Sequence, residues 1–163
     1  MAKISLRSTR ELSACIDRTL ARLIPQLRAL LPGAELHHVG ATALPEAVTK
    51  GDLDILVRVP EAGFSEATET LKSHFSTKQP ENWTHEFASF GDDTAYEVPV
   101  GVQLLVKDCE QDFMLFIRDY LAANPSAVAG YNRLKFDHAG DSGDGYWRAK
   151  DAFFSKILAL RKG

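Results

Sequence analysis

The sequence predicts an α/β (α+β) domain in which helices flank a mixed sheet. The expected strands lie mostly in the middle of the chain, and the expected helices lie at both ends. A length of 163 residues favours one domain over residues 1–163, long enough to bury its own core. Apolar residues make up 45% of the chain and charged residues 25%, which is ordinary for a globular protein and excludes a disordered one.

The first helix is expected to begin near Ser8, because Ser8 and Glu11 have the spacing of a capping box. Apolar residues then recur at helical spacing over residues 12–30. Pro25 lies within this stripe and is expected to kink or split the helix, and Pro32 is expected to stop it.

The middle of the chain carries the strand signals. The run over residues 52–59 is the strongest of them, since it is β-branched and largely alternates apolar with polar residues. Residues 61–75 have helical spacing, and a hairpin is expected around Gly91, with its arms in residues 83–90 and 94–98. Further expected segments are a strand at Glu35–Val39, a loop with one helical turn over 40–51, and a strand at Val100–Val106.

The last third is expected to be helical. Phe113, Phe116, Ile117 and Tyr120 mark the apolar face of a first helix. Asn124 followed by Pro125 has the pattern of a cap and a first helical residue, so a second helix is expected there. A loop over residues 140–143 and a final helix rich in aromatic residues complete the chain.

Asp52 and Asp54 are the first candidates for chemistry. Residues i and i+2 of a strand point to the same face, so two carboxylates are expected to project side by side. They would repel each other unless a cation lay between them, and Mg²⁺ (or Mn²⁺) prefers such oxygen ligands. The alternative is that one aspartate is simply a solvent-exposed residue at the start of a strand.

The segment before this pair favours the functional interpretation. A strand that contains His38 runs into Gly40, Ala41 and Thr42, where a helical turn is expected to present free backbone N–H groups suited to a phosphate. A phosphate-binding turn followed by paired carboxylates on the next strand is typical of metal-assisted phosphoryl transfer.

At this point the sequence resembles the GrpB family of the polymerase-β-like nucleotidyltransferase superfamily. The resemblance is carried by residues 38–45 and 49–57, and in the C-terminal part by residues 116–121, Asn124-Pro125, Tyr131, Lys135, Tyr146 and Lys150. It spans about residues 35–158. It implies a nucleotidyltransferase-like mixed sheet flanked by helices, with additional helices at the C-terminus.

The resemblance implies that the Gly40–Thr42 turn faces phosphate and that Asp52 and Asp54 hold a metal ion. Two departures bear on activity. Ala41 replaces a usual serine, so a hydroxyl for the phosphate is missing unless Thr42 supplies it. The superfamily's third carboxylate falls near Gln103, which is neutral, and Glu97 is a weak substitute for it.

Arg118, Lys135 and Lys150 are the candidates for offsetting phosphate charge, and Lys50 lies just before the acidic pair. Each has a structural alternative: Arg118 can pair with the neighbouring Asp119, and the lysines can be surface charges. His38 can contact substrate or hold the turn by a hydrogen bond.

Tyr131 and Lys135 share one helix face, as do Tyr146 and Lys150. Tyr131 can stack a base or be part of the core.

The leading hypothesis is therefore a metal-dependent enzyme that transfers a nucleotidyl group from a nucleoside triphosphate to an acceptor. The alternatives are an inactive nucleotide- or metabolite-binding module of the same fold and a protein-interaction domain. A net charge of −3 makes long nucleic acid an unfavourable partner, since its affinity depends on neutralised phosphates. The absence of a membrane-length apolar run and of a signal-peptide pattern at the start predicts a cytoplasmic protein.

Overall fold

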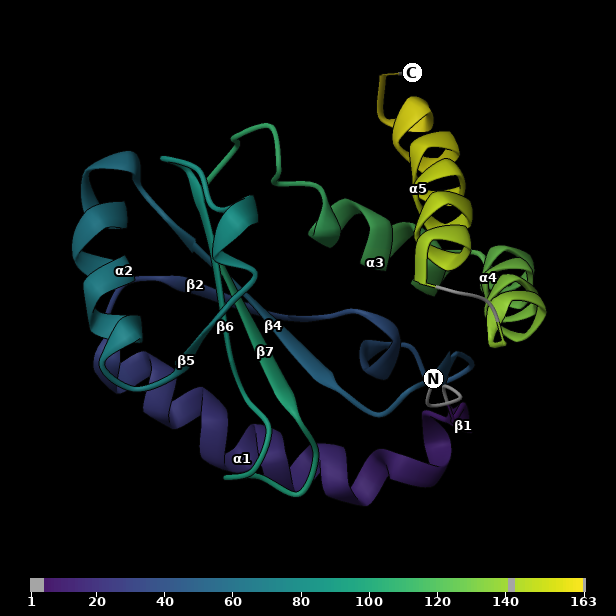
Figure 1. Cartoon of the computed structure of the whole chain (residues 1–163), viewed down its shortest axis with the longest axis horizontal. Coiled ribbons are helices and arrows are strands. Elements are labelled where there is room, and N and C mark those ends of the chain that lie inside the picture. Colours follow the sequence, from purple (N-terminus) through teal and green to yellow (C-terminus); the bar gives the residue numbers. More distant parts are fainter. Residues whose placement is uncertain (1–4, 141–142, 163) are drawn as a thin grey trace.

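A five-stranded sheet with helices on both faces forms the centre of the computed structural model (Figure 1), which describes residues 5–140 and 143–162. In spatial order its strands are β2 (Glu35–Val39), β4 (Leu53–Val59), β7 (Val100–Val106), β6 (Phe87–Asp92) and β5 (Ser76–Lys78). Strands β4 and β7 are parallel, and the other neighbours are antiparallel. The mixed α/β fold expected from the sequence is confirmed.

Helices cover the two faces unequally. Figure 1 shows α1 and α2 along one side of the sheet, and α3, α4 and α5 on the other side at the end away from α2. The helices are α1 (Ser13–Leu30), α2 (Phe64–Lys72), α3 (Met114–Ala123), α4 (Pro125–His138) and α5 (Gly143–Ala159). The short 3-10 turns are η1 (Arg10–Leu12), η2 (Ala41–Ala43), η3 (Glu61–Gly63), η4 (Pro80–Asn82) and η5 (Leu160–Lys162). Outside the main sheet, strand β1 (Arg7–Ser8) pairs with β3 (Val48–Thr49). No described helix is both long enough and apolar enough to cross a membrane.

Alternation along β4 fixes what each face of the sheet carries. Leu53, Ile55 and Val57 are fully buried in the main core beneath α1 and α2. Asp54 points to the other face, together with Leu56, which packs in a smaller core under α3. A slip of one residue would place the aspartate in the main apolar core, so hydrophobic packing sets the register.

The first helix starts later and less regularly than the capping box implies. Residues 10–12 form the turn η1, and α1 begins at Ser13. The Ser8 hydroxyl does accept a hydrogen bond from the Arg10 N–H at 3.1 Å, whereas Glu11 pairs with Arg7. Pro25 lies inside α1 without ending it.

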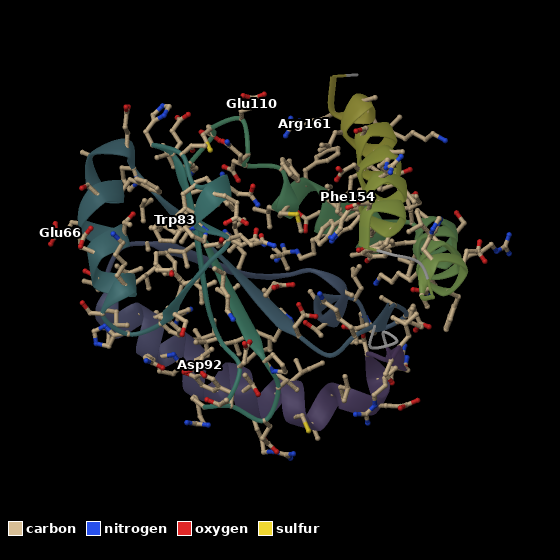
Figure 2. All side chains as sticks on the ribbon, viewed as in Figure 1. Glu66, Trp83, Asp92, Glu110, Phe154 and Arg161 are labelled. Atoms are coloured by element: carbon tan, nitrogen blue, oxygen red, sulfur yellow. The ribbon has the colours of Figure 1, made fainter. Side chains whose placement is uncertain are left out.

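The expected hairpin around Gly91 is wrong in its second arm. Strand β6 pairs with β7 on one side and β5 on the other, and residues 94–98 form no strand. Asp92 accepts hydrogen bonds from the backbone N–H groups of Thr94 and Ala95, which curls the chain away from the sheet before β7. Trp83 (labelled in Figure 2) packs against Phe90 of β6 at the main core, with ring centroids 5.1 Å apart.

The three C-terminal helices form a second core with the turn η2. Phe154 of α5 (Figure 2) belongs to it, and the other buried members are Leu44, Ala47, Ile117, Leu121, Val128, Tyr131 and Ile157. The predicted break at Asn124-Pro125 between α3 and α4 is confirmed, although the Asn124 side chain donates back to the Tyr120 carbonyl instead of capping α4. Of the loop expected over residues 140–143, residues 141 and 142 lie outside the described part.

Candidate functional site

Asp52 and Asp54 lie at the start of β4, on the face of the sheet that the C-terminal helices approach. Asp54 is flanked across both neighbouring strands by glycines: Gly101 is its partner on β7, and Gly40 follows its partner Val39 on β2. A Cβ atom on Gly40 would lie 2.7 Å from Oδ2 of Asp54, and one on Gly101 would lie 2.7 Å from Oδ1. Because neither glycine has that atom, the carboxylate fits into a hollow between them.

This position disfavours a charge on Asp54. Burial, reinforced by the nearby Asp52 carboxylate, raises the pKa of Asp54 from 3.8 to about 7, although Lys150 and Lys50 oppose the shift. A cation between the two carboxylates would remove most of this penalty. The carboxylates of Asp52 and Asp54 therefore provide some of the ligands of a metal site, and other groups would have to supply the rest.

The turn after β2 is held in place by contacts on the side that faces away from the main cleft. Gly40 has φ 80° and ψ −174°, a combination that is almost restricted to glycine, and η2 follows it. The Thr42 hydroxyl lies 2.9 Å from Nε2 of His38, and burial, followed by the charge of Arg118, lowers the pKa of His38 to about 4. His38 and Thr42 line a second groove beside α1, so they brace the turn instead of lining the main cleft.

Two lysines of the C-terminal helices face the acidic pair, and we call Lys135 and Lys150 the basic wall and Asp52 and Asp54 the acidic wall. Lys135 is 5% exposed, with its Nζ 3.9 Å from the centre of the Tyr131 ring and 2.5 Å from the Val48 carbonyl oxygen, to which it donates. Burial, with Lys150 nearby, lowers its pKa from 10.5 to about 7.

The Nζ atom of Lys150 lies 4.8 Å from the centre of the Trp147 ring and 5.5 Å from that of Phe154. Burial lowers the pKa of Lys150, although the Asp54 carboxylate opposes this.

Side-chain hydrogen bonds bring the basic wall to the loop before β4. Asn132 of α4 accepts from the Val48 N–H at 2.9 Å and donates to the Glu46 carbonyl at 2.8 Å. Together with the Lys135–Val48 bond, these contacts fasten α4 to the segment that leads into Asp52. These side-chain to main-chain hydrogen bonds thus bring two segments that are far apart in the sequence to the same cleft.

The two walls border one cleft of about 670 Å³. The predicted site residues that line it are Gly40, Ala41, Lys50, Asp52, Asp54, Arg118, Tyr131, Lys135 and Lys150. Arg118 of α3 also donates to the His38 carbonyl at 3.1 Å and to Asp119 at 2.8 and 3.0 Å, so the ion pair considered as an alternative is present as well. Tyr131 is 5% exposed and stacks on Phe153, which makes it part of the core at the edge of the cleft.

Neither substitute for a third carboxylate extends the acidic wall. Gln103 lines the cleft with a neutral amide, and Glu97 is held by Arg18 of α1 at 2.7 and 2.9 Å, outside the cleft lining. Sequence reasoning missed Trp147 and Asp151, which line the cleft from α5. Their i, i+4 spacing, one residue after the Tyr146–Lys150 pair, is a signal that could have identified them.

Mg²⁺ (or Mn²⁺) fits the acidic wall, since the buried Asp54 carboxylate lies near that of Asp52 and a cation would offset their repulsion. The described residues contain no group of three or more histidine, cysteine, aspartate or glutamate side chains placed to hold a metal. An ion there would need further ligands from water or substrate phosphates, as Mg²⁺ commonly has.

Fold and cleft together define a mixed α/β protein with a candidate metal- and phosphate-binding site. The chain belongs to the GrpB family, since residues 10–160 match that family, described as GrpB protein. It is 36% identical to a UPF0157 protein of Vibrio cholerae and 30% identical to one of Deinococcus radiodurans, in both cases over 82% of this chain and 70% of the relative.

Among solved structures, the conserved protein GrpB from Enterococcus faecalis is similar, with a TM-score of 0.71 and 25% identity over 91% of this chain and 94% of that one. A likeness to the Cid1 poly(U) polymerase has a TM-score of 0.49 at 17% identity, over 81% of this chain and 41% of that one, and is too weak to bear on function.

Proposed function

We propose that this GrpB protein is a metal-dependent nucleotidyltransferase of the polymerase-β-like superfamily. It would bind a nucleoside triphosphate with Mg²⁺ and transfer the nucleotidyl group to an acceptor. The observation that carries the proposal is the opposition of two carboxylates and two lysines across one cleft. Each set of like charges is unfavourable alone, and a metal–triphosphate complex would complement both.

In this proposal Asp52 and Asp54 hold the metal. A bound Mg²⁺ would neutralise phosphate charge and orient the phosphates for in-line displacement. The glycine-flanked hollow orients the Asp54 carboxylate, because any side chain at Gly40 or Gly101 would displace it.

The Gly40–Ala41 turn and the basic wall would receive the phosphates. The first N–H groups of a helical turn have no partner within that turn and so can donate to phosphate oxygens. Lys135 and Lys150 are positioned by aromatic rings, and Lys135 also by a carbonyl group. Their side chains would therefore lose little conformational entropy when a phosphate binds.

The transfer step balances as a simple substitution at phosphorus. An acceptor oxygen would attack the α-phosphorus while the bond to the bridging β-phosphate oxygen breaks and pyrophosphate leaves with that electron pair. The acceptor proton would pass to water, since Gln103 cannot accept it as a carboxylate would. This predicts a modest rate.

The test is incubation with α-labelled nucleoside triphosphates and Mg²⁺, scored for label transfer and for metal-dependent nucleotide binding by calorimetry. Asp54→Asn should abolish both, since the ligand to the metal is lost while size and shape are kept. Asp137→Asn is the matched control, because Asp137 is exposed on α4 outside the cleft lining and should leave both signals intact. Unchanged metal-dependent binding in Asp54→Asn would refute the site assignment.

A second candidate function is a non-catalytic nucleotide-binding module, which the neutral Gln103 beside the acidic wall favours. The same experiment separates the two. Metal-dependent binding that is lost in Asp54→Asn, without label transfer to any acceptor or to water, would support the module over the enzyme.

A further inference from the structure

The cleft also has a part whose polar side chains are uncharged. Beyond the acidic wall its lining includes four amide side chains, which we call the amide end: Gln79, Asn82, Gln103 and Gln111. They come from four places in the chain, namely the residue before η4, the end of η4, strand β7 and the segment before α3. The chain has only four glutamines, and three of them are here.

Gln103 lies in the floor of this end, one row of the sheet beyond Asp54. Its neighbours across the strands are Leu56 on β4 and Ser89 on β6. The Ser89 hydroxyl already donates to the Lys78 carbonyl at 2.7 Å, and Leu56 offers no polar group. Among the described residues the Gln103 amide has no hydrogen-bond partner, although it is only partly exposed in the middle of a sheet.

Because no buried side-chain N or O atom of the described residues lacks a partner, the unpaired Gln103 amide must be open to the cleft, where a ligand can reach it. A polar group partly removed from water loses hydrogen bonds that an apolar side chain of the same size would not need. The surrounding lining is apolar and includes Phe87 and Met114. A leucine or methionine would suit that environment better than glutamine if the position served packing alone.

The other amides point to the same conclusion. Gln79 and Asn82 are exposed and make no side-chain hydrogen bond within the described residues, so their amides are available to a ligand as well as to water. Gln111 accepts from the Cys109 thiol at 3.5 Å, which leaves its NH₂ group available. Donors and acceptors are therefore both present on uncharged side chains.

We propose that the amide end binds a nucleobase, with Gln103 as the central hydrogen-bonding contact. A planar ring with adjacent donors and acceptors matches side-chain amides, which carry both on one group, and its faces match Phe87 and Phe113. Uncharged amides match a neutral ring better than a phosphate or carboxylate, although Arg118 lies one helical turn from Met114 in the same lining. The proposal deepens the proposed function, on which it rests for the identity of the ligand, and the base can belong to the nucleoside triphosphate or to the acceptor.

Calorimetry on the full chain with three probes tests this: inorganic tripolyphosphate, the four nucleosides and the four nucleoside triphosphates, each with Mg²⁺. Gln103→Met keeps the size of the side chain and removes the amide. It should weaken binding of the preferred base-containing probe about tenfold, the loss expected for one or two hydrogen bonds, and leave tripolyphosphate unchanged. Gln26→Met is the matched control, because Gln26 lies outside the cleft lining and accepts a hydrogen bond from the Tyr96 hydroxyl.

The probes identify the source of the base. Weaker triphosphate binding in Gln103→Met assigns the amide end to the base of the nucleotide itself. Unchanged triphosphate binding, with weaker binding of a nucleoside to protein saturated with tripolyphosphate, assigns it to the acceptor. Asn82→Ala, a change on an exposed turn, should weaken binding of the same probe as Gln103→Met does, but by a smaller factor.

The proposal is overturned if both variants fold and bind every nucleoside and triphosphate as the wild type does, or if tripolyphosphate binding falls equally. Its failure is distinct from that of the proposed function. Nucleoside binding at the amide end needs neither the acidic wall nor turnover, so it should persist in Asp54→Asn.

Discussion

The acidic and basic walls of the cleft are built in opposite ways. The acidic wall comes from two residues of one strand end, and it depends on what is missing beside them, namely the side chains of Gly40 and Gly101. The basic wall comes from two separate helices, and it depends on what is packed around it: the rings of Tyr131 and Trp147 and a main-chain carbonyl. One wall is made by strand register and the other by tertiary packing, and burial disfavours the charged state on both.

The largest effect should come from filling the hollow of the acidic wall. Gly40→Ala would add a Cβ 2.7 Å from the Asp54 carboxylate at a backbone conformation suited only to glycine, and should cost about 3 kcal/mol or more of unfolding free energy. Gly33→Ala is the control, since Gly33 also has positive φ but nothing within 4 Å, and should cost about 1 kcal/mol. Equal losses in urea denaturation would show that the hollow is not tightly packed.

The two walls should titrate in opposite senses. The pKa of Asp54 is raised from 3.8 to about 7, so its contribution to stability is complete below pH 4 and is lost as pH rises through 7. The pKa of Lys135 is lowered from 10.5 to about 7, so its contribution is complete above pH 10.5 and is lost as pH falls through 7. Together they predict a minimum of unfolding free energy near pH 7.

Single substitutions test which residue causes the fall in stability on the acidic side of this minimum and which causes the rise on its alkaline side. Measured by urea denaturation, Asp54→Asn should remove the acidic limb, on the order of 2 kcal/mol, and Lys135→Met the alkaline limb. A wild-type profile with a maximum near pH 7, unchanged by either substitution, would contradict the opposed charges.

Binding should distinguish the basic wall from other lysines of the same helix. Lys150→Met should weaken tripolyphosphate binding about tenfold, because a charge-assisted contact is lost. Lys156→Met changes an exposed lysine farther along α5, outside the cleft lining, and should have no effect. Calorimetry that finds the two variants equal would mean that phosphates do not reach the basic wall.

The smallest effect tests the turn that joins the walls. Ala41 lines the cleft at the position where the proposed relation to the nucleotidyltransferases implies a serine, so Ala41→Ser should improve tripolyphosphate affinity by about threefold through one added hydrogen bond. Ala43→Ser places its hydroxyl toward the second groove instead and should change nothing. If the two variants behave alike in calorimetry, the turn does not face the phosphates.

Residues close together in the chain were predictable, and residues brought together by packing were less so. The acidic pair followed from strand periodicity, and the turn before it from glycine and small residues, because both are local patterns. The same local reasoning gave β6 the wrong partner, since the choice of neighbour depends on which strand completes the sheet.

By itself the sequence determined the strand that carries Asp54 and directly follows Asp52, the helical ends of the chain and the family resemblance, because alternation, helical spacing and glycine act over a few positions. Only the tertiary structure decided that Thr42 turns its hydroxyl to His38, that Glu97 pairs with Arg18, and that Gln103 lines the cleft without a hydrogen-bond partner in the described part of the chain. Side-chain direction and partner are set by what packs from distant segments, and no spacing in the chain encodes that.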